Sequence, residues 1–327
     1  MVLEAGHDNV NKQPKVFIII LNWNGKNDTI ECIESVRNIN YSNFEIIIVD
    51  NGSTDDSEKT IKKAFPDVIF LQTGANLGFA EGNNVGIRHA LGVGADYIFL
   101  LNNDTTIEAD AISHLVDFAE KNDGAGIIGP KILFYSEPKR IWFAGGIVDF
   151  EKGSSHRGGG RPDDGKFDEI VETDYITGCA LLIKAGVIDK IGLMIPDYFL
   201  LFEESDWCLR AKKAGYKIFY IPKARVYHKC STAFSFGKSR AHKAARAPSW
   251  IYYYVRNNLL FIKRHLKGSV RRRAYVNCVK RSFKWLEWKN IEQRIDRLLA
   301  ILTGFLDFSL RRFGRRDNLN FRRFWIK

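Results

Sequence analysis

The chain has 327 residues but only five cysteines, which are scattered and include no Cys-x-x-Cys pair. An odd, dispersed set argues against a disulfide framework and a cysteine-based zinc site, so a reducing, cytoplasmic location is expected. No apolar run reaches the roughly 18 residues that a membrane-spanning helix needs. The longest candidate, Leu298 to Leu310, is interrupted by Asp307. The first residues show no basic segment followed by an apolar one, so no export signal is expected.

Two familiar nucleotide-binding motifs are also missing. The first apolar segment is not followed by Gly-x-Gly-x-x-Gly, and no Gly-x-x-x-x-Gly-Lys-Ser/Thr occurs anywhere. These absences exclude a P-loop ATPase and argue against a dinucleotide site of the usual kind. With 45% hydrophobic and 27% charged residues, the chain can nevertheless build a substantial core, which excludes a disordered protein.

Charge is distributed unevenly along the chain. Residues 211–327 contain 30 Lys and Arg against 5 Asp and Glu, a balance of +25, whereas residues 1–210 have a balance of −14. Such asymmetry indicates an anionic membrane or nucleic-acid partner for the C-terminal part. We therefore expect an N-terminal tail at 1–14, a main domain at 15–238 and a basic helical region at 239–327.

The first hundred residues alternate short apolar runs with helical patterns. The runs are expected to be strands, at 15–21, 44–49, 68–71 and 97–101, and the segments between them to be helices, at 28–38, 55–64 and 80–91. Strands that are apolar on both faces and alternate with helices indicate an α/β fold with a doubly wound, mostly parallel sheet.

The pattern changes after Glu120. Further strands are expected at 126–134 and 141–150, a mobile surface loop at 153–165, a helix at 203–214, and a strand at 217–221 that ends at Pro222. In the basic region, helical spacing places one set of apolar residues on a single face, with Arg294 and Arg297 on another. That set is Ile291, Ile295, Leu298, Leu302, Phe305 and Leu306.

Short polar residues follow each of the first four strands. In an open α/β sheet, ligands bind beyond the carboxyl ends of the strands, so four such segments indicate a binding crevice. The alternative is ordinary turn chemistry, which uses the same residue types. The residues concerned are Asn22, Asn24, Asp50, Asn51, Asn76, Gly78, Asn83, Asn84, Asn102, Asn103 and Asp104.

Two groups could carry chemistry at this crevice. Asp104 is placed to hold a divalent cation that bridges phosphate oxygens, and His228 is a second candidate ligand, although a single histidine is often only structural. Glu203, Glu204 and Asp206 form an acidic cluster beside Phe202 and Trp207. Partial burial and crowding would raise a carboxyl pKa toward that of a general base, but acids at a helix N-terminus are also common without function.

Six ordered motifs across residues 15–235 resemble glycosyltransferase family 2, in its rhamnosyltransferase-like branch. They are LNWNG, VDNGSTD, NLGFAEGNN, LLNNDT, FEESDWCLRAKKAGY and the later histidine. The resemblance implies a GT-A fold, which is Rossmann-like with a mostly parallel central sheet, here followed by a basic C-terminal helical extension. It also implies inverting transfer of a sugar from a nucleoside-diphosphate sugar.

The resemblance assigns roles to individual residues. Asp50 matches the acid that binds the base, and Asn22 and Asn24 would line the nucleoside pocket. The Asp-x-Asp metal motif falls on Asn102-Asn103-Asp104, so its first acid is an amide here and metal dependence could be weaker. His228 matches a metal ligand for Mg²⁺ or Mn²⁺, and Glu204, preceded by Glu203, matches the catalytic base.

The resemblance also addresses the acceptor side. Asp206 is expected to orient the acceptor or the helix start, and Thr177, Gly178, Cys179 and Trp207 to lie under the acceptor. The donor is expected to be a dTDP- or UDP-sugar, with rhamnose suggested by the branch. The acceptor would be a hydroxyl of a glycan or polyprenyl-linked glycan in the synthesis of a cell-surface polysaccharide.

Several alternatives stay open at this point. The basic, aromatic-rich region suits an anionic bilayer on the inner face of the cell membrane, or its aromatic residues only pack helices together. Nucleic acid is disfavoured because no recognised binding motif accompanies the charge. In place of a transferase, the chain could be a non-catalytic nucleotide-sugar or glycan-binding module. A nucleotidyltransferase is disfavoured because its Gly-rich, Arg-containing first loop is missing.

Overall fold

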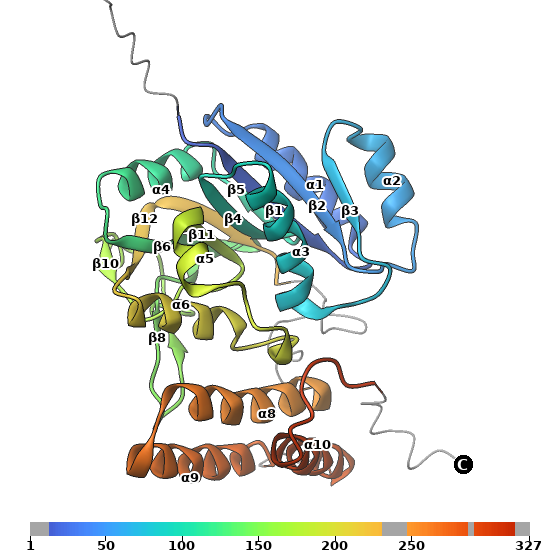
Figure 1. Ribbon diagram of the computed structural model, residues 1–327, viewed down its shortest axis with the longest axis vertical. Coiled ribbons are helices and arrows are strands. Elements are labelled where there is room, and N and C mark those ends of the chain that lie inside the picture. The colour runs from blue at the N-terminus through green and yellow to red at the C-terminus, as the bar shows by residue number, and fades with distance from the viewer. Residues whose placement is uncertain (1–12, 231–246, 287–290, 318–327) are drawn as a thin grey trace, which may run out of the picture.

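The computed structural model describes residues 13–230, 247–286 and 291–317. A sheet with helices on both faces forms the larger part, and three C-terminal helices form a layer beneath it (Figure 1). Apolar side chains of the sheet part form one large cluster, and those around Ile251 and Ile262 form a separate one. The predicted boundary at residue 238 lies outside the described residues, so the division into domains stays a prediction.

The N-terminal half of the sheet is parallel. Its central strand β1 pairs with β2 on one side and with β4 on the other, so that Ile18 lies opposite both Ile46 and Phe99. The first five residues of β1 are fully buried because helices cover both faces of the sheet. The elements are β1 (Val16–Asn22), α1 (Lys26–Arg37), β2 (Phe44–Asp50), α2 (Ser57–Ala64), β3 (Ile69–Gln72), α3 (Gly78–Gly92) and β4 (Tyr97–Asn102).

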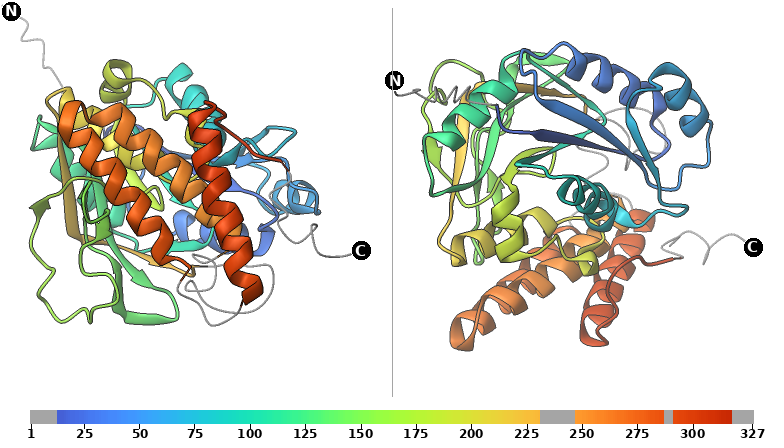
Figure 2. Two further views of the ribbon diagram at one scale, coloured as in Figure 1. Left: turned by 90° about the horizontal axis from the view of Figure 1, so that it is seen from below. Right: turned by 45° about the horizontal axis from the view of Figure 1, so that its top comes forward.

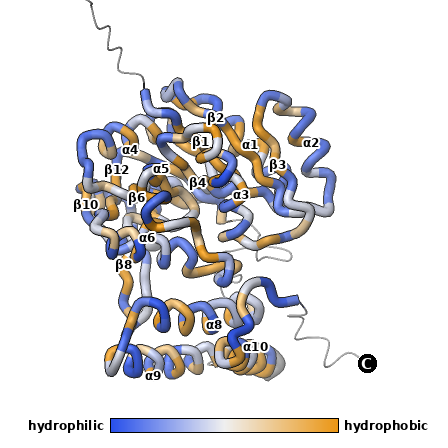
Figure 3. Tube along the Cα trace, viewed as in Figure 1, coloured by the Kyte–Doolittle hydropathy of each residue, from blue (hydrophilic) through white to orange (hydrophobic). Residues whose placement is uncertain are grey.

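The second half of the sheet is mixed. The strand order is β10-β12-β6-β11-β4-β1-β2-β3, with β11 antiparallel to both of its neighbours and β12 parallel to β6. The prediction of a mostly parallel α/β sheet is thus confirmed (Figure 3 shows the apolar strands at its centre). The elements are β5 (Thr105–Ile107), α4 (Ala111–Glu120), β6 (Ala125–Phe134), β7 (Glu137–Phe143), β8 (Gly146–Ile147), β9 (Ser155–His156), β10 (Val171–Glu172), β11 (Ala180–Lys184), α5 (Ala185–Ile191), the short 3₁₀ helix η1 (Pro196–Tyr198), α6 (Glu203–Lys213) and β12 (Lys217–His228).

Strand β12 does not end at Pro222, as its sequence predicts. It runs on to His228, and its register against β6 shifts between Ile221 and Arg225. Proline lacks the N–H that a regular ladder requires, and an irregularity of this kind accommodates it. This continuation matters for the site because it carries His228 back to the sheet edge beside β5.

The expected loop at 153–165 is bound to the protein along much of its length. The Gly160 N–H donates to the Ile141 carbonyl, and Arg157 Nη1 donates to the Ala144 carbonyl at 3.2 Å. Asp163 accepts from the buried ammonium of Lys131 at 2.6 Å. These contacts join the segment to the sheet part at several points, and its predicted mobility stays a prediction. The strand expected at 141–150 is divided between β7 and β8, where Gly145 adopts a φ of 100°.

Three helices follow the sheet: α8 (Pro248–His265), α9 (Gly268–Lys284) and α10 (Ile291–Ser309). None of the described helices is both long enough and apolar enough to cross a membrane. In α10, Leu302 and Leu306 face outward whereas Arg297 is 5% exposed, so the apolar set identified in the sequence does not coincide with the buried face. Helix α10 instead packs on α8 through small residues, and a Cβ on Gly304 would lie 3.1 Å from the Tyr252 carbonyl oxygen.

Candidate active site

The predicted nucleoside residues converge where β1 and β2 end. Asn22 is fully buried, and its amide donates to the Asp50 carboxylate at 2.9 Å and to the Ser53 hydroxyl at 3.1 Å. Asp50 also accepts from the Ser53 N–H at 2.7 Å. Asn24, with a φ of 53°, shapes the next loop by accepting from the Thr54 N–H at 2.8 Å. The carboxylate is therefore fixed rigidly at the carboxyl edge of the sheet.

Asn51 ties this cluster to the segment that leads into α3. Its Nδ2 donates to the Asn76 side chain at 3.2 Å and to the Gly78 carbonyl at 3.1 Å. Gly78 has a φ of 82°, and a Cβ there would lie 2.4 Å from the Phe199 carbonyl oxygen. Only glycine fits this position, because L residues avoid that backbone region and the space is taken.

Asn83 and Asn84 make bonds within the fold. Asn83 Nδ2 donates to the Phe79 carbonyl one helical turn back, at 2.9 Å. Asn84 both donates to and accepts from the backbone of Met194, and both asparagines are almost fully buried. The geometry gives these two residues a role in anchoring α3, and their predicted contact with the donor receives no support from it.

The metal motif follows β4. Asn103 Nδ2 donates to the Thr29 hydroxyl at 3.0 Å, and that hydroxyl donates to Asn22 Oδ1 at 2.8 Å. The motif is thus connected to the nucleoside cluster. Asp104 is 8% exposed, and its Oδ1 lies 3.1 Å from Nε2 of His228. Two residues 124 positions apart are brought together because β5 pairs with the end of β12.

Asp104 and His228 fit a metal ion held mainly by its substrate. No group of three or more His, Cys, Asp or Glu able to hold a metal occurs among the described residues. A Mg²⁺ or Mn²⁺ ion in a nucleotide site characteristically takes one or two protein ligands and completes its shell with phosphate oxygens and water. A carboxylate and an imidazole in contact at a sheet edge meet that requirement.

The acidic pair begins helix α6. Glu203 is 4% exposed, and the Oε2 atoms of Glu203 and Glu204 are buried without a hydrogen-bond partner among the described residues. Burial raises the pKa of Glu204 to about 7. Burial, together with the charge of Glu204, raises the pKa of Glu203 well above its usual value. Burial thus favours the protonated form of both carboxyl groups.

The segment before β11 joins the acids to the metal motif. A Cβ on Gly178 would lie 2.7 Å from the Phe79 ring and 3.8 Å from Glu204 Cβ. The next residue, Cys179, is 3% exposed, and its carbonyl accepts from the Asn102 N–H at 2.9 Å. Consecutive residues of one segment thus lie against Glu204 and against the strand end that carries Asp104. Thr177 is 7% exposed on the same segment.

Two residues expected near the acceptor serve the fold. Trp207 is fully buried, and its indole N–H donates to the Gly192 carbonyl at 2.8 Å, so it cannot line an acceptor surface. Asp206 is also fully buried, and its carboxylate contacts Arg210, Arg264 and His265 at 2.7, 3.0 and 2.9 Å. Both point inward because α6 turns this face toward the core and α8. The predicted catalytic role of Asp206 finds no support in this arrangement.

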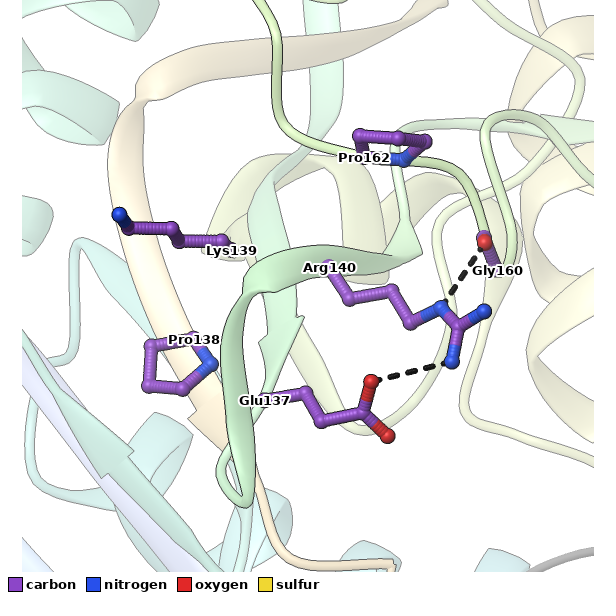
Figure 4. Close-up of a pocket in the computed structure, with 6 residues that line it drawn as sticks. All are labelled: Glu137, Pro138, Lys139, Arg140, Gly160 and Pro162. Carbon is purple, nitrogen blue, oxygen red and sulfur yellow. Dashed lines mark hydrogen bonds and ion pairs between the residues drawn. The ribbon is translucent and has the colours of Figure 1, made fainter.

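Several residues of the site were not predicted from the sequence. Thr29 lies within α1, Phe79 of α3 packs against Gly178, and the Trp142 ring stands edge-on to His228 with centroids 4.5 Å apart. No motif marks these residues, because their positions depend on packing between distant elements. A surface pocket beside β7 is a separate feature, in which Arg140 contacts Glu137 and the Gly160 carbonyl (Figure 4).

Comparison with known proteins supports the same reading. The family model for glycosyl transferase family 2 matches residues 17–191, more than half of the chain, and the chain belongs to this family. A solved structure of GalNAc-T7 with UDP, GalNAc and Mn²⁺ superposes with a TM-score of 0.61 at 15% identity, covering 91% of this chain and 56% of that one. This likeness confirms the predicted GT-A fold.

Curated relatives agree with the predicted branch. The dTDP-rhamnosyl transferase RfbF of Shigella flexneri is 23% identical over 76% of this chain and 80% of its own. The N-acetylglucosaminyl-diphospho-decaprenol L-rhamnosyltransferase of Mycobacterium tuberculosis is 28% identical over 62% of this chain and 69% of its own. The hexosyltransferase Agl10 of Haloferax volcanii is 25% identical, and the match spans 62% of each chain.

Proposed function

We propose that the protein is an inverting glycosyltransferase that moves a sugar from a nucleoside-diphosphate sugar to a hydroxyl of a glycan or lipid-linked glycan. The observation that carries the proposal is the Glu204 carboxyl group, whose Oε2 is buried without a hydrogen-bond partner among the described residues and whose pKa is raised to about 7, beside the segment that contacts the metal motif. A nearly neutral base beside a phosphate-binding edge suits transfer to an alcohol. Burying a carboxyl group costs free energy, and a non-catalytic binding module would gain nothing from it.

The donor is proposed to lie along the carboxyl ends of β1, β2 and β4. Asp50, held by Asn22 and Ser53, would accept hydrogen bonds from the nucleobase. The dTDP-rhamnosyl transferase and the UDP-bound structure among its relatives make a dTDP- or UDP-sugar the proposed donor class, with rhamnose as the first candidate sugar.

Asp104 and His228 would hold a Mg²⁺ or Mn²⁺ ion, which when bound neutralises charge on the departing diphosphate. The chain's own groups act on the other side of the sugar. Glu204 removes the proton from the acceptor hydroxyl, and the resulting oxygen attacks the anomeric carbon from the face opposite the leaving group. A single displacement of this kind inverts the configuration and requires no enzyme nucleophile.

The acceptor is proposed to be presented at an anionic membrane surface, on its cytoplasmic face. The name of the Mycobacterium relative specifies a diphospho-decaprenol acceptor, which is a lipid, and the C-terminal region of this chain is strongly basic. Basic residues near an anionic leaflet contribute about 1 kcal/mol each to binding. A polyprenyl-linked glycan is therefore the proposed acceptor class.

A thermal-shift panel of nucleotide sugars tests the donor assignment. With donor at about one hundred times its Kd, binding stabilises the folded state by about 2.7 kcal/mol, which raises the melting temperature. We expect dTDP- or UDP-sugars to produce this shift with Mn²⁺ and a smaller one with EDTA. Asp50→Ala is expected to abolish the shift, whereas Asp123→Ala, on the exposed loop before β6, should retain it. A shift only with nucleoside triphosphates would contradict the proposal.

A further inference from the structure

Helix α9 has one face against α8 and an apolar face away from it. Ala274, Cys278 and Ser282 are buried at intervals of four residues. The opposite side of the helix carries Val276, Val279 and Phe283, which are 53%, 37% and 41% exposed. Apolar side chains of this size are seldom grouped on a free surface of a water-soluble protein without a partner.

Helix α10 repeats this arrangement. Ala300, Ile301 and Gly304 face α8, while Leu302 and Leu306 on the far side are 48% and 54% exposed. Helices α9 and α10 are the elements nearest the viewer when the molecule is seen from below (Figure 2, left). The Phe283 and Phe305 rings lie 6.4 Å apart between centroids and join the two helices. The exposed apolar residues of α9 and α10 together form what we call the outer face.

The charge along α9 has one sign, whereas α10 contains Glu292, Asp296 and Asp307 as well as Arg294 and Arg297. Helix α9 contains six Lys or Arg residues and no Asp or Glu. Arg272, Lys280 and Lys284 are exposed beside the apolar residues. Valine, leucine and phenylalanine bordered by basic side chains are typical of helices that lie in the interface of an anionic membrane. A protein partner would more commonly require mixed charge or aromatic anchors in a pocket.

We propose that the outer face of α9 and α10 inserts into the interface of an anionic phospholipid bilayer. This identifies the membrane-contacting residues of the proposed function, but the binding does not depend on catalysis. Helix α8 then lies between the bilayer and the start of α6, which carries Glu203 and Glu204. With helix axes about 8–10 Å apart, the acids stand roughly two helix layers above the lipid. An acceptor anchored in the membrane would have to extend its glycan over that height.

Vesicle flotation with the full chain tests this proposal. The wild type is expected to float with vesicles of equal phosphatidylcholine and phosphatidylglycerol, and to remain behind with phosphatidylcholine alone. The double variant V276E/L306E should bind the anionic vesicles about tenfold more weakly, because it places charge in the apolar layer. The matched control is V93E, which changes an apolar residue that is 50% exposed at the end of α3 and should bind as the wild type does.

Three outcomes would overturn the proposal. One is equal binding to both vesicle types, and another is full binding by V276E/L306E. The third is a wild type that ignores vesicles but elutes as a dimer that the double variant converts to a monomer, since the outer face would then join two copies. Nucleotide-sugar hydrolysis by V276E/L306E at the wild-type rate would separate a failure of lipid binding from a failure of the enzyme.

A second inference concerns the loop before the acidic pair. Phe199, Leu201 and Phe202 have φ values of 61°, 71° and 77°. Non-glycine residues in this region are disfavoured by about 1–3 kcal/mol each, so surrounding contacts must hold them. The carbonyls of a backbone in this conformation also do not join the regular hydrogen-bond pattern of a helix or a sheet. The loop ends directly at Glu203 and Glu204.

Helix α8 supplies those contacts with two fully buried side chains. Asn257 Nδ2 lies within hydrogen-bond distance of the carbonyls of Tyr198, Leu200 and Leu201, at 2.8, 2.7 and 3.0 Å. Arg256 Nη2 donates to the Tyr198 carbonyl at 3.1 Å, and its Nε donates to Asn257 Oδ1 at 2.9 Å. The two residues therefore act as one unit against the carbonyls of Tyr198, Leu200 and Leu201.

The opposite side of the same loop meets the donor side of the molecule. The Phe199 carbonyl accepts from the Phe79 N–H at 2.6 Å, at the start of α3. Phe79 in turn packs against Gly178, which adjoins Glu204. The loop is thus held between the nucleotide-binding edge and α8, and small shifts of either side would move the acids.

We infer that Arg256 and Asn257 are positioning residues that hold the loop 199–202 and thereby fix Glu204 for proton transfer. The inference rests on the proposed role of Glu204. It assigns a positioning role to α8, which lies beyond the residues that the family model matches: the helix that lies above the outer face also orients the base.

The kinetics of N257A and R256K test this positioning role. We expect kcat to fall about tenfold or more while the KM for the donor changes little, since a displacement of about 1 Å costs that much in rate. The acid limb of the pH profile should also move to lower pH, because a loosened loop admits water and lowers the pKa of Glu204 from about 7. The titratable groups facing Glu204 are Glu203, Tyr175 and Cys208.

A control variant separates this positioning role from a general loss of stability. N122A removes a comparable amide-to-carbonyl bond at the end of α4 and should leave both kcat and the pH profile unchanged. Hydrogen exchange of residues 197–204 should quicken in N257A but not in N122A, whether or not the wild type transfers sugar. Unchanged hydrogen exchange in N257A, or a fall in kcat without a shift of the pH profile, would refute the positioning role of Arg256 and Asn257.

Discussion

Replacing Glu204 with glutamine is expected to lower the rate of sugar transfer by about 10²–10⁴-fold, the usual contribution of a general base. Glutamine has nearly the same shape and leaves the buried site packed, but it cannot accept the proton of the acceptor hydroxyl. Donor binding should be retained, because the nucleoside cluster around Asp50 makes no contact with Glu204. Single-turnover transfer and the thermal shift with donor would measure these two quantities separately.

The pH dependence of the wild type follows from the same group. A base works only when deprotonated, and the pKa of Glu204 is raised to about 7 by burial. Transfer should therefore decline as the pH falls through about 7 and reach a plateau above it. In E204Q this acid limb should disappear from the residual activity.

Two further variants sharpen the assignment. E203Q should lower the rate of transfer less than E204Q, because burial raises the pKa of Glu203 and an uncharged amide matches the neutral form that burial favours. E172Q, on exposed β10, should behave as the wild type. Equal transfer by E204Q and the wild type would remove the general-base role, and with it the distinction from a non-catalytic binding module.

The parallel strands and the residues at their ends were predictable because they depend on local pattern. Buried β-branched runs specify strands such as β1, and a polar residue that follows each strand must lie at the carboxyl edge of a parallel sheet. For this reason Asn22 and Asp50 meet at that edge, and Asn103 is connected to them through the Thr29 hydroxyl. The family resemblance then supplied the pairing of Asp104 with His228, which no local pattern contains.

What the sequence could not predict depends on contacts between distant elements. Periodicity identified the apolar residues of α10 but not which side meets α8, and the small residues around Gly304 decided that orientation. The resemblance implies that Asp206 orients the acceptor or the helix start and that Trp207 lies under the acceptor, yet successive helical residues point 100° apart and these two face the core. Arg256 and Asn257 carry no motif at all.

Replacing Asp104 with asparagine is expected to remove most of the metal-dependent activity, with transfer reduced by about 10²-fold or more. Asparagine keeps the size of the side chain and a polar contact with His228, but it loses the charge that a divalent ion requires. Binding of Mn²⁺ in the presence of UDP, followed by calorimetry, should weaken in D104N and remain normal in D123N, on an exposed loop.

Because residue 102 is an asparagine, metal binding by this motif should depend mainly on Asp104. Because the first acid of the metal motif is absent, Asp104 would be the only carboxylate of the described motif facing the ion, and no second acid could compensate for its loss. The reverse change, N102D, should accordingly tighten Mn²⁺ binding and restore part of it in N102D/D104N. If D104N transfers sugar at the wild-type rate in both Mn²⁺ and EDTA, the diphosphate must be neutralised by the protein alone, and the metal assignment of Asp104 and His228 fails.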